Sequence, residues 1–87
     1  MAEEKKIGII EKFFAKIGVA AIRITEDGLR VGDTIRIKGH TTDLEMKIES
    51  MQIEHAPVQK ADPGESVGIR TPTRVREHDA VYKVIQE

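Results

Sequence analysis

The sequence contains no cysteine, which excludes disulfide bonds and thiolate metal ligands as supports for the fold. This absence favours a reducing cytoplasm as the location of the protein. Tryptophan is absent as well, and two phenylalanines and one tyrosine are the only aromatic residues among the 87. The core must therefore consist of aliphatic side chains, of which β-branched isoleucine and valine suit the pleated surface of a sheet.

Residues 1–6 (MAEEKK) carry charges of both signs, and no apolar stretch follows them that could serve as a signal sequence or span a membrane. Fourteen Lys and Arg residues against fifteen Asp and Glu residues give a net charge of −1. This balance argues against strong unspecific binding to duplex DNA, because such binding depends on bulk positive charge. We therefore expect a soluble cytoplasmic protein without membrane contact, on which any basic patch is local.

Short segments of alternating apolar and polar residues fill the chain, and Gly and Pro separate them. No window free of Gly and Pro sustains the 3.6-residue period of a helix. Because a chain of 87 residues forms one domain, we predict a single all-β barrel over 1–87, with a flexible tail over 1–5. Six strands are expected, at 6–14, 17–24, around Ile35 and Ile37, over 44–53 with a bend beyond Ser50, around Val67 and Ile69, and at 80–85.

Two irregular segments are expected within this pattern. The apolar positions change register between Val19 and Ile22, which predicts a β-bulge near Ala20 or Ala21. Residues 56–65 contain Pro57, Pro63 and Gly64 and are predicted not to form regular strand. The side chains expected to point into the barrel are those of Ile35, Ile37, Leu44, Met46, Ile48, Val67 and Ile69.

Three stretches resemble segments of the second domain of elongation factor Tu and its relatives. They are 28–37 (GLRVGDTIRI), 48–52 (IESMQ) and 60–69 (KADPGESVGI), and they follow one another in the order and separation of that family. The resemblance implies a six-stranded antiparallel Greek-key barrel of the translation-protein domain 2 type. The glycines and Asp33 in these motifs serve tight turns, so the motifs specify a fold rather than a reaction.

A narrower resemblance is to short stand-alone translation-factor-like proteins and to the C-terminal barrel of collagenase-like peptidases. It rests on 16–20 (KIGVA), 38–43 (KGHTTD) and 74–79 (RVREHD). It implies a non-catalytic binding module that contacts RNA, a ribosomal component or an RNA-modifying partner through the barrel rim. The alternative is a protein-only adaptor that docks onto a separate collagenase-like peptidase or RNA-modifying enzyme.

The sequence singles out no catalytic or metal-binding group. His40, His55 and His78 lack the short spacing that brings two imidazoles to one metal ion. The aspartates fall at predicted turns, where they cap backbone groups, and no nucleophile, base and orienting residue can be named together. We therefore predict a protein that is not an enzyme and that uses neither a metal nor a cofactor.

Eight residues are predicted to contact RNA or a protein partner. The loop of His40, Thr41 and Thr42 presents an imidazole and hydroxyls for phosphate or ribose, although the same groups also satisfy a turn. The resemblance to elongation factor Tu places Gln52 where that family has a Glu near the ribose of the tRNA 3′ end.

The other four predicted contact residues are Arg70, Arg74, Arg76 and His78, which lie close together in the sequence. Arginine forks bind phosphate groups in a bidentate manner. Ion pairs with Glu77 and Asp79 on a solvated surface are the alternative for these arginines.

No G-x-x-x-x-G-K-[ST] phosphate loop is present, so the chain has no cradle of backbone N–H groups for nucleotide phosphates. We predict that neither GTP nor ATP binds at physiological concentrations. The measurement is a thermal melt with and without each nucleotide and Mg²⁺. A rise of several degrees in the melting temperature would contradict the prediction.

Overall fold

The computed structural model describes residues 2–86, and in this range the chain forms strands joined by turns and loops, with no helix. Ten strands follow one another: β1 (Ala2–Phe14), β2 (Val19–Ile24), β3 (Leu29–Arg30), β4 (Thr34–Lys38), β5 (Asp43–Lys47), β6 (Met51–Ile53), β7 (Ala56–Val58), β8 (Lys60–Ala61), β9 (Ser66–Arg70) and β10 (Ala80–Gln86). None of the described residues belongs to a helix that could cross a membrane.

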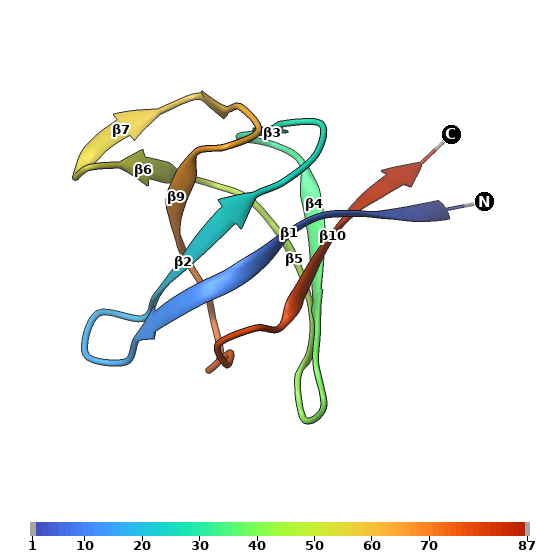
Figure 1. The fold of residues 1–87 in the computed structure, drawn as a ribbon, viewed down its shortest axis with the longest axis horizontal. Coiled ribbons are helices and arrows are strands. Elements are labelled where there is room, and N and C mark those ends of the chain that lie inside the picture. Colours follow the sequence, from blue (N-terminus) through green and yellow to red (C-terminus); the bar gives the residue numbers. More distant parts are fainter. Residues whose placement is uncertain (1, 87) are drawn as a thin grey trace.

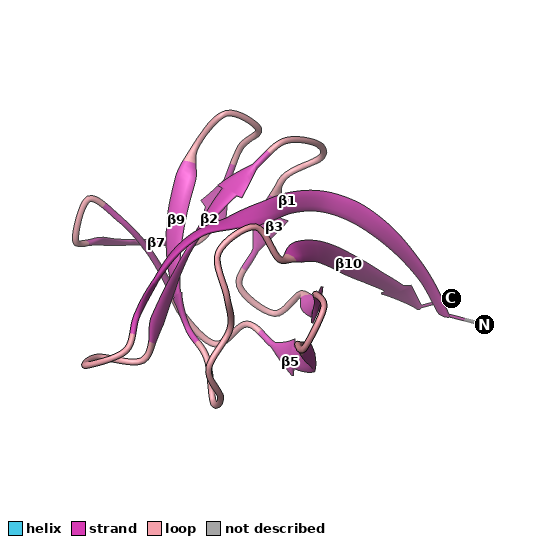
Figure 2. Ribbon diagram, turned by 60° about the horizontal axis from the view of Figure 1, so that its bottom comes forward, coloured by secondary structure: helices cyan, strands magenta, loops and turns pink. Residues whose placement is uncertain are grey.

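Eight of the strands form one antiparallel sheet in the order β5-β4-β10-β1-β2-β9-β6-β7, and β3 pairs with β8 in a separate ribbon. The large sheet curls strongly, so that its strands surround a common interior (Figures 1 and 2). The two ends of the chain lie side by side, because β1 and β10 pair from Ala2 opposite Gln86 to Ile9 opposite Ala80.

The all-β antiparallel prediction is confirmed, whereas the closed six-stranded Greek-key barrel is not. The pairing gives ten strands, and among residues 2–86 no ladder joins the edge strands β5 and β7 to close the large sheet. The segment 56–65, predicted to lack regular strand, contains β7 and β8. Pro57 is tolerated in β7 because that strand is an edge of the sheet.

The N-terminal segment also differs from the expected tail over 1–5. Residues 2–5 are paired in β1 with residues 83–86 of β10, while Met1 lies outside the described residues. The expected bulge near Ala20 or Ala21 belongs to the neighbouring strand instead. β2 alternates regularly, and the register shift lies in β1 between Ile10 and Lys12. Sequence periodicity cannot show a bulge that lies in the partner strand.

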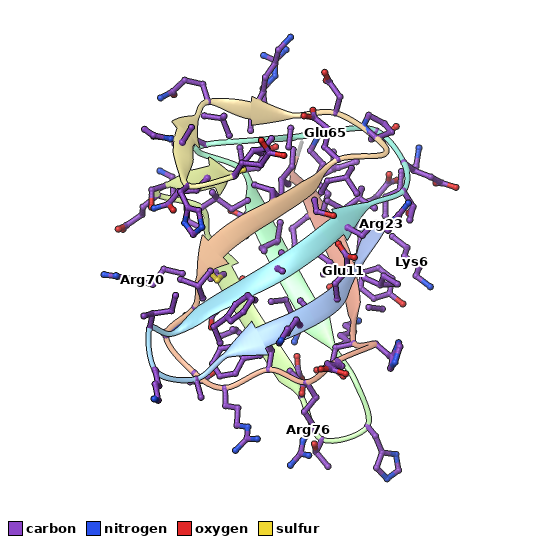
Figure 3. All side chains as sticks on the ribbon, turned by 60° about the vertical axis from the view of Figure 1, so that its left-hand side comes forward. Lys6, Glu11, Arg23, Glu65, Arg70 and Arg76 are labelled. Carbon is purple, nitrogen blue, oxygen red and sulfur yellow. The ribbon has the colours of Figure 1, made fainter. Side chains whose placement is uncertain are left out.

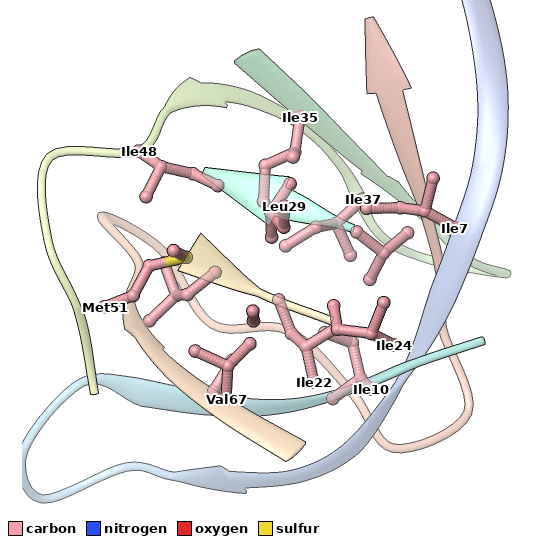
Figure 4. Packing of buried hydrophobic residues seen from close by; sticks show 14 of the residues in the cluster. Ile7, Ile10, Ile22, Ile24, Leu29, Ile35, Ile37, Ile48, Met51 and Val67 are labelled. Atoms are coloured by element: carbon pink, nitrogen blue, oxygen red, sulfur yellow. The ribbon is translucent and has the colours of Figure 1, made fainter. Parts of the chain in front are cut away.

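The interior is filled by aliphatic side chains and one methionine (Figure 4). The buried apolar residues are Ile7, Ile10, Ala20, Ile22, Ile24, Leu29, Ile35, Ile37, Ile48, Met51, Ala61, Val67, Ile69, Val75 and Val81. Five of the seven predicted core residues are among them, and the other two, Leu44 and Met46, are half-buried and pack against this core. Their partial exposure reflects their position in the edge strand β5.

Candidate docking surfaces

One end of the sheet is covered by the loop 71–79, which connects β9 to β10. Val75 at its centre is 1% exposed and closes the core at this end. The loop is tied to the turn between β1 and β2, where the Thr71 N–H donates to the Gly18 carbonyl at 2.9 Å. The Thr71 hydroxyl donates to the Thr73 carbonyl at 2.8 Å. These bonds hold the loop close to the sheet.

Asp79 fixes the second half of this loop. Its side chain is buried, and its carboxylate accepts the Arg76 backbone N–H at 2.9 Å. Its backbone carbonyl accepts the Ile10 N–H at 2.9 Å, and the neighbouring His78 N–H donates to the Ile10 carbonyl at 2.8 Å. Gly39 of the β4–β5 hairpin packs directly on the Asp79 carboxylate, which leaves no room for a Cβ atom. Asp79 therefore joins the loop, β1 and the hairpin.

The turn 15–18, the hairpin residues 39–42 and the loop 71–79 together form a surface that we call the loop end. His40, Thr41 and His78, three of the predicted contact residues, are exposed here. Thr42 is buried instead, with an exposed fraction of 8%. Its backbone carbonyl accepts the Gly39 N–H at 2.8 Å and closes the hairpin.

Arg74 and Arg76 line a shallow hollow of about 290 Å³ at the loop end, together with Phe13, Ala15, Val75 and Glu77. Within residues 2–86, no carboxylate forms an ion pair with the Arg70, Arg74 or Arg76 side chain. The Asp79 carboxylate is bonded to the Arg76 backbone instead. The structure therefore does not show the alternative, a surface pairing of these arginines with Glu77 and Asp79, among residues 2–86.

Two large apolar side chains are also exposed to solvent. Phe14 is 41% exposed and Ile17 is 59% exposed, and both lie where β1 turns into β2. The Lys12 ammonium lies 5.3 Å from the centre of the Phe14 ring, a distance suited to a cation–π interaction. Ile17 of the loop end and the adjoining Phe14 thus add apolar area to a surface that also carries Arg74 and Arg76, and protein interfaces likewise combine apolar and arginine side chains.

A second surface feature is a groove of about 620 Å³ between β5 on one side and β6 and β9 on the other, which we call the seam groove. It is lined by Val19, Met46, Lys47, Glu49, Ser50, Gln52, Gly68, Arg70 and Pro72. Two predicted contact residues, Gln52 and Arg70, meet here. Figure 3 shows Arg70 and Arg76 on separate parts of the surface, so the predicted arginine cluster is divided.

Sequence reasoning missed Lys47, which lies in the seam groove with Arg70. The alternation of β5 places Lys47 on its exposed face. Its proximity to Arg70 arises from the curl of the sheet, which brings strands that are distant in the pairing order together. No local signal in the sequence indicates such a contact.

Other cations are engaged in ion pairs on the outer face of β4. Arg36 contacts Glu4, Asp43 and Glu45, and Lys38 lies 2.6 Å from Glu4. The hydrogen bond from Lys38 lowers the pKa of Glu4 below its ordinary value, and that from Arg36 lowers the pKa of Asp43. Arg36 and Lys38 are therefore already neutralised by carboxylates, in contrast to the arginines of the loop end.

Comparison with known proteins places the chain beside collagenase-like peptidases. It is 45% identical over 78 residues, 88% of its length, to part of an uncharacterized protease of Methanocaldococcus jannaschii. It is 36% identical over 73 residues, 83% of its length, to part of a collagenase of Porphyromonas gingivalis. These stretches make up 19% and 20% of the two relatives, so the chain spans about a fifth of their length. No protein-family model matches the chain.

Two crystal structures share the fold. The C-terminal domain of a putative U32 peptidase of Geobacillus thermoleovorans superposes with a TM-score of 0.83, at 17% identity and with 91% of each chain covered. The selenomethionine variant of that domain gives a TM-score of 0.82, at 16% identity, covering 88% of this chain and 96% of the domain. The predicted resemblance to the C-terminal domain of collagenase-like peptidases is confirmed, and the one to elongation factor Tu stays a prediction.

The contact between Gly39 and Asp79 leads to a test of how the loop end is held together. We expect Asp79→Ala to lower the free energy of unfolding by about 1–3 kcal/mol, because the partly buried Arg76 N–H loses its acceptor. Gly39→Ala alone should also destabilise the protein, since the new methyl group overlaps the carboxylate. In the Asp79→Ala background that overlap disappears.

The measurement is a double-mutant cycle by denaturant unfolding. The cost of the double variant should fall short of the sum of the single costs by about 1 kcal/mol or more, within the range found for contacting residues. Asp79→Asn keeps a carboxamide oxygen as acceptor and is the matched control, with a smaller loss than Asp79→Ala. Additive costs would show that the hairpin and the loop are not coupled through this contact.

Proposed function

We propose that this chain is a non-catalytic docking domain that binds the body of a collagenase-like peptidase. The observation that carries the proposal is the 45% identity with a fifth of a protein named as a protease. In such a relative, the remaining four fifths of the polypeptide accompany this segment. The likeness of its fold to a domain named as C-terminal supports an accessory role rather than a catalytic one.

The chemistry of the loop end supports docking to a protein. Ile17 and the adjoining Phe14 offer apolar area, and Arg74 and Arg76 of the same end have no ion-pair partners among residues 2–86. Buried apolar anchors and arginine are the groups that dominate the free energy of protein association. The complementary surface on the peptidase body would be an apolar patch edged by carboxylates.

RNA binding through Arg70, Arg74 and Arg76 is a second candidate function. The three arginines predicted to contact phosphate are free of carboxylate partners within the described part of the chain. Arginine in this condition is available for phosphate oxygens. The division of the cluster leaves Arg74 and Arg76 together and Arg70 apart in the seam groove.

The docking proposal is tested with the Methanocaldococcus jannaschii relative from which the matched segment has been deleted. We expect the present chain to bind this truncated protein as a one-to-one complex, measured by calorimetry and by light scattering. The double variant Phe14→Ser, Ile17→Ser should weaken binding at least tenfold, because anchor residues each contribute more than about 1 kcal/mol. The double variant Arg74→Ala, Arg76→Ala should weaken it as well.

A matched control removes the same amount of charge elsewhere. Arg30 and Lys60 are exposed and face each other in the ribbon of β3 and β8, away from the loop end. The double variant Arg30→Ala, Lys60→Ala should leave the affinity unchanged. Absence of binding by the unaltered chain, or equal losses for both pairs of cations, would contradict docking through the loop end.

The RNA candidate predicts a different result in a salt titration. Replacing Arg70, Arg74 and Arg76 together by Ala should weaken binding to RNA by roughly 1–3 kcal/mol and reduce the slope of log affinity against log salt by about two to three. Thermal melts should change little, because the arginines have no ion pairs within residues 2–86 to lose. Equal slopes for both proteins would eliminate RNA phosphate as the partner of these residues.

A further inference from the structure

The ribbon of β3 and β8 places two cations directly opposite each other. Arg30 pairs with Lys60, and both residues are exposed. In the adjoining pair, the Val31 N–H donates to the Gln59 carbonyl at 3.0 Å. Hydrogen-bonded and non-bonded pairs alternate along an antiparallel ladder, so Arg30 and Lys60 form a non-bonded pair, in which side chains lie closest. Like charges in facing positions destabilise a sheet.

No carboxylate compensates this pair of cations. Among residues 2–86, neither the Arg30 guanidinium nor the Lys60 ammonium forms an ion pair. The Asp33 carboxylate accepts the Arg30 backbone N–H at 2.9 Å and lies 3.6 Å from the Lys83 ammonium instead. The ribbon therefore carries a repulsion between two cations that a bound anion would remove.

Lys83 of β10 brings a third cation to the same place. Together with Arg30 and Lys60 it lines a hollow of about 250 Å³. Its side chain is 26% exposed, and its ammonium donates to the Gly28 carbonyl at 3.2 Å and contacts Asp33. These contacts hold the ammonium in place before a ligand arrives, which lowers the cost of ordering it on binding.

Two carboxylates, those of Asp27 and Asp62, also belong to the lining of the hollow. The Asp27 carboxylate is paired with the Lys5 ammonium at 3.0 Å and is thereby neutralised. Asp62 has no such partner among residues 2–86. The three cations of the lining thus exceed the one carboxylate that remains uncompensated.

We propose that this hollow, which we call the ribbon site, binds a phosphate dianion, either free phosphate or a small phosphate monoester. Such an anion presents three strong acceptor oxygens, and the three cations reach it from three different strands. The Arg30 guanidinium would bind two of the oxygens in a bidentate manner, and the ammonium groups of Lys60 and Lys83 would compensate the second charge. The small volume of the hollow leaves room for a small organic substituent only.

Other anions fit the ribbon site less well. A carboxylate or a phosphate diester of a nucleic-acid backbone carries a single charge, which compensates only one of the two facing cations. A dianion compensates Arg30 and Lys60 together. The ribbon lies at the opposite end of the molecule from the loop end (Figure 1), so this proposal is independent of docking through that surface.

The probes are inorganic phosphate, glycerol 1-phosphate and dimethyl phosphate, each compared with chloride at equal ionic strength. We expect the two dianions to shift the backbone amide resonances of Arg30, Lys60 and Lys83. They should also raise the melting temperature, because a ligand of the folded state stabilises it. Dimethyl phosphate, a monoanionic diester, should bind about tenfold more weakly or less. Tighter binding of glycerol 1-phosphate would identify a monoester as the ligand, and binding of inorganic phosphate alone would identify free phosphate.

The double variant Arg30→Ala, Lys60→Ala should weaken phosphate binding by about tenfold or more, because it removes two charge-assisted contacts. Its matched control is Lys12→Ala, Arg23→Ala, which removes the same charge from exposed positions of β1 and β2. The control should change the affinity by less than about twofold.

Lys60→Glu gives a readout that a loss of folding cannot imitate. The new carboxylate would face Arg30, and opposite charges in facing positions stabilise a sheet. We therefore expect this variant to melt at a higher temperature than the unaltered chain in chloride, and to show no rise in melting temperature on addition of phosphate.

Several results would contradict the proposal. Tens of millimolar phosphate that leaves the three amide resonances unshifted would do so, as would equal losses of affinity in the two double variants, which would indicate general attraction of anions. Binding of dimethyl phosphate as tight as that of the dianions would point to a nucleic-acid backbone instead. If Arg30→Ala, Lys60→Ala does not fold, Lys60→Glu and the titrations of the unaltered chain decide the matter.

Discussion

The fold depends on the two ladders of β1, which pairs with β10 along one edge and with β2 along the other. Its register shifts once in each ladder, between Lys6 and Gly8 and between Ile10 and Lys12. Such irregularities bend a strand and increase its twist. Ile7 and Ile10, which flank the shifts, are both completely buried. The strand therefore wraps the sheet around a core of aliphatic side chains, which are small enough to pack inside it.

The two surface features, the loop end and the seam groove, lie where the curled sheet ends. At the loop end, the core must be covered by a loop without secondary structure, and Val75 and the buried Asp79 hold that loop in place. At the seam groove, the curl brings β5 near β9 without joining them by hydrogen bonds. The loop end thus presents side chains on a loop that is held in place, whereas the seam groove lies between strands that are not hydrogen-bonded to each other.

The strands of the central sheet could be predicted from the sequence. The opening of the sheet between its edge strands β5 and β7 could not. Alternation identified β4, β9 and β10, because each has one face on the core. It could not indicate β7 and β8, which are short and contain or adjoin proline. For the predicted contact residues too, the sequence does not indicate which strands the curl of the sheet brings together. Arg74, Arg76 and His78 share one loop, as their spacing predicts, whereas Arg70 joins Gln52 and Lys47 only through the curl of the sheet.

The distribution of ion pairs distinguishes structural cations from cations available to a partner. Arg36 and Lys38 lie on the outer face of β4, where they contact Glu4 from β1 and Asp43 and Glu45 from β5. These exposed pairs contribute little stability, but they leave a face with no surplus positive charge. Within residues 2–86, the cations without such partners include those of the loop end and the seam groove. A net charge of −1 therefore conceals two local positive surfaces, and an acidic partner is attracted to them rather than to the molecule as a whole.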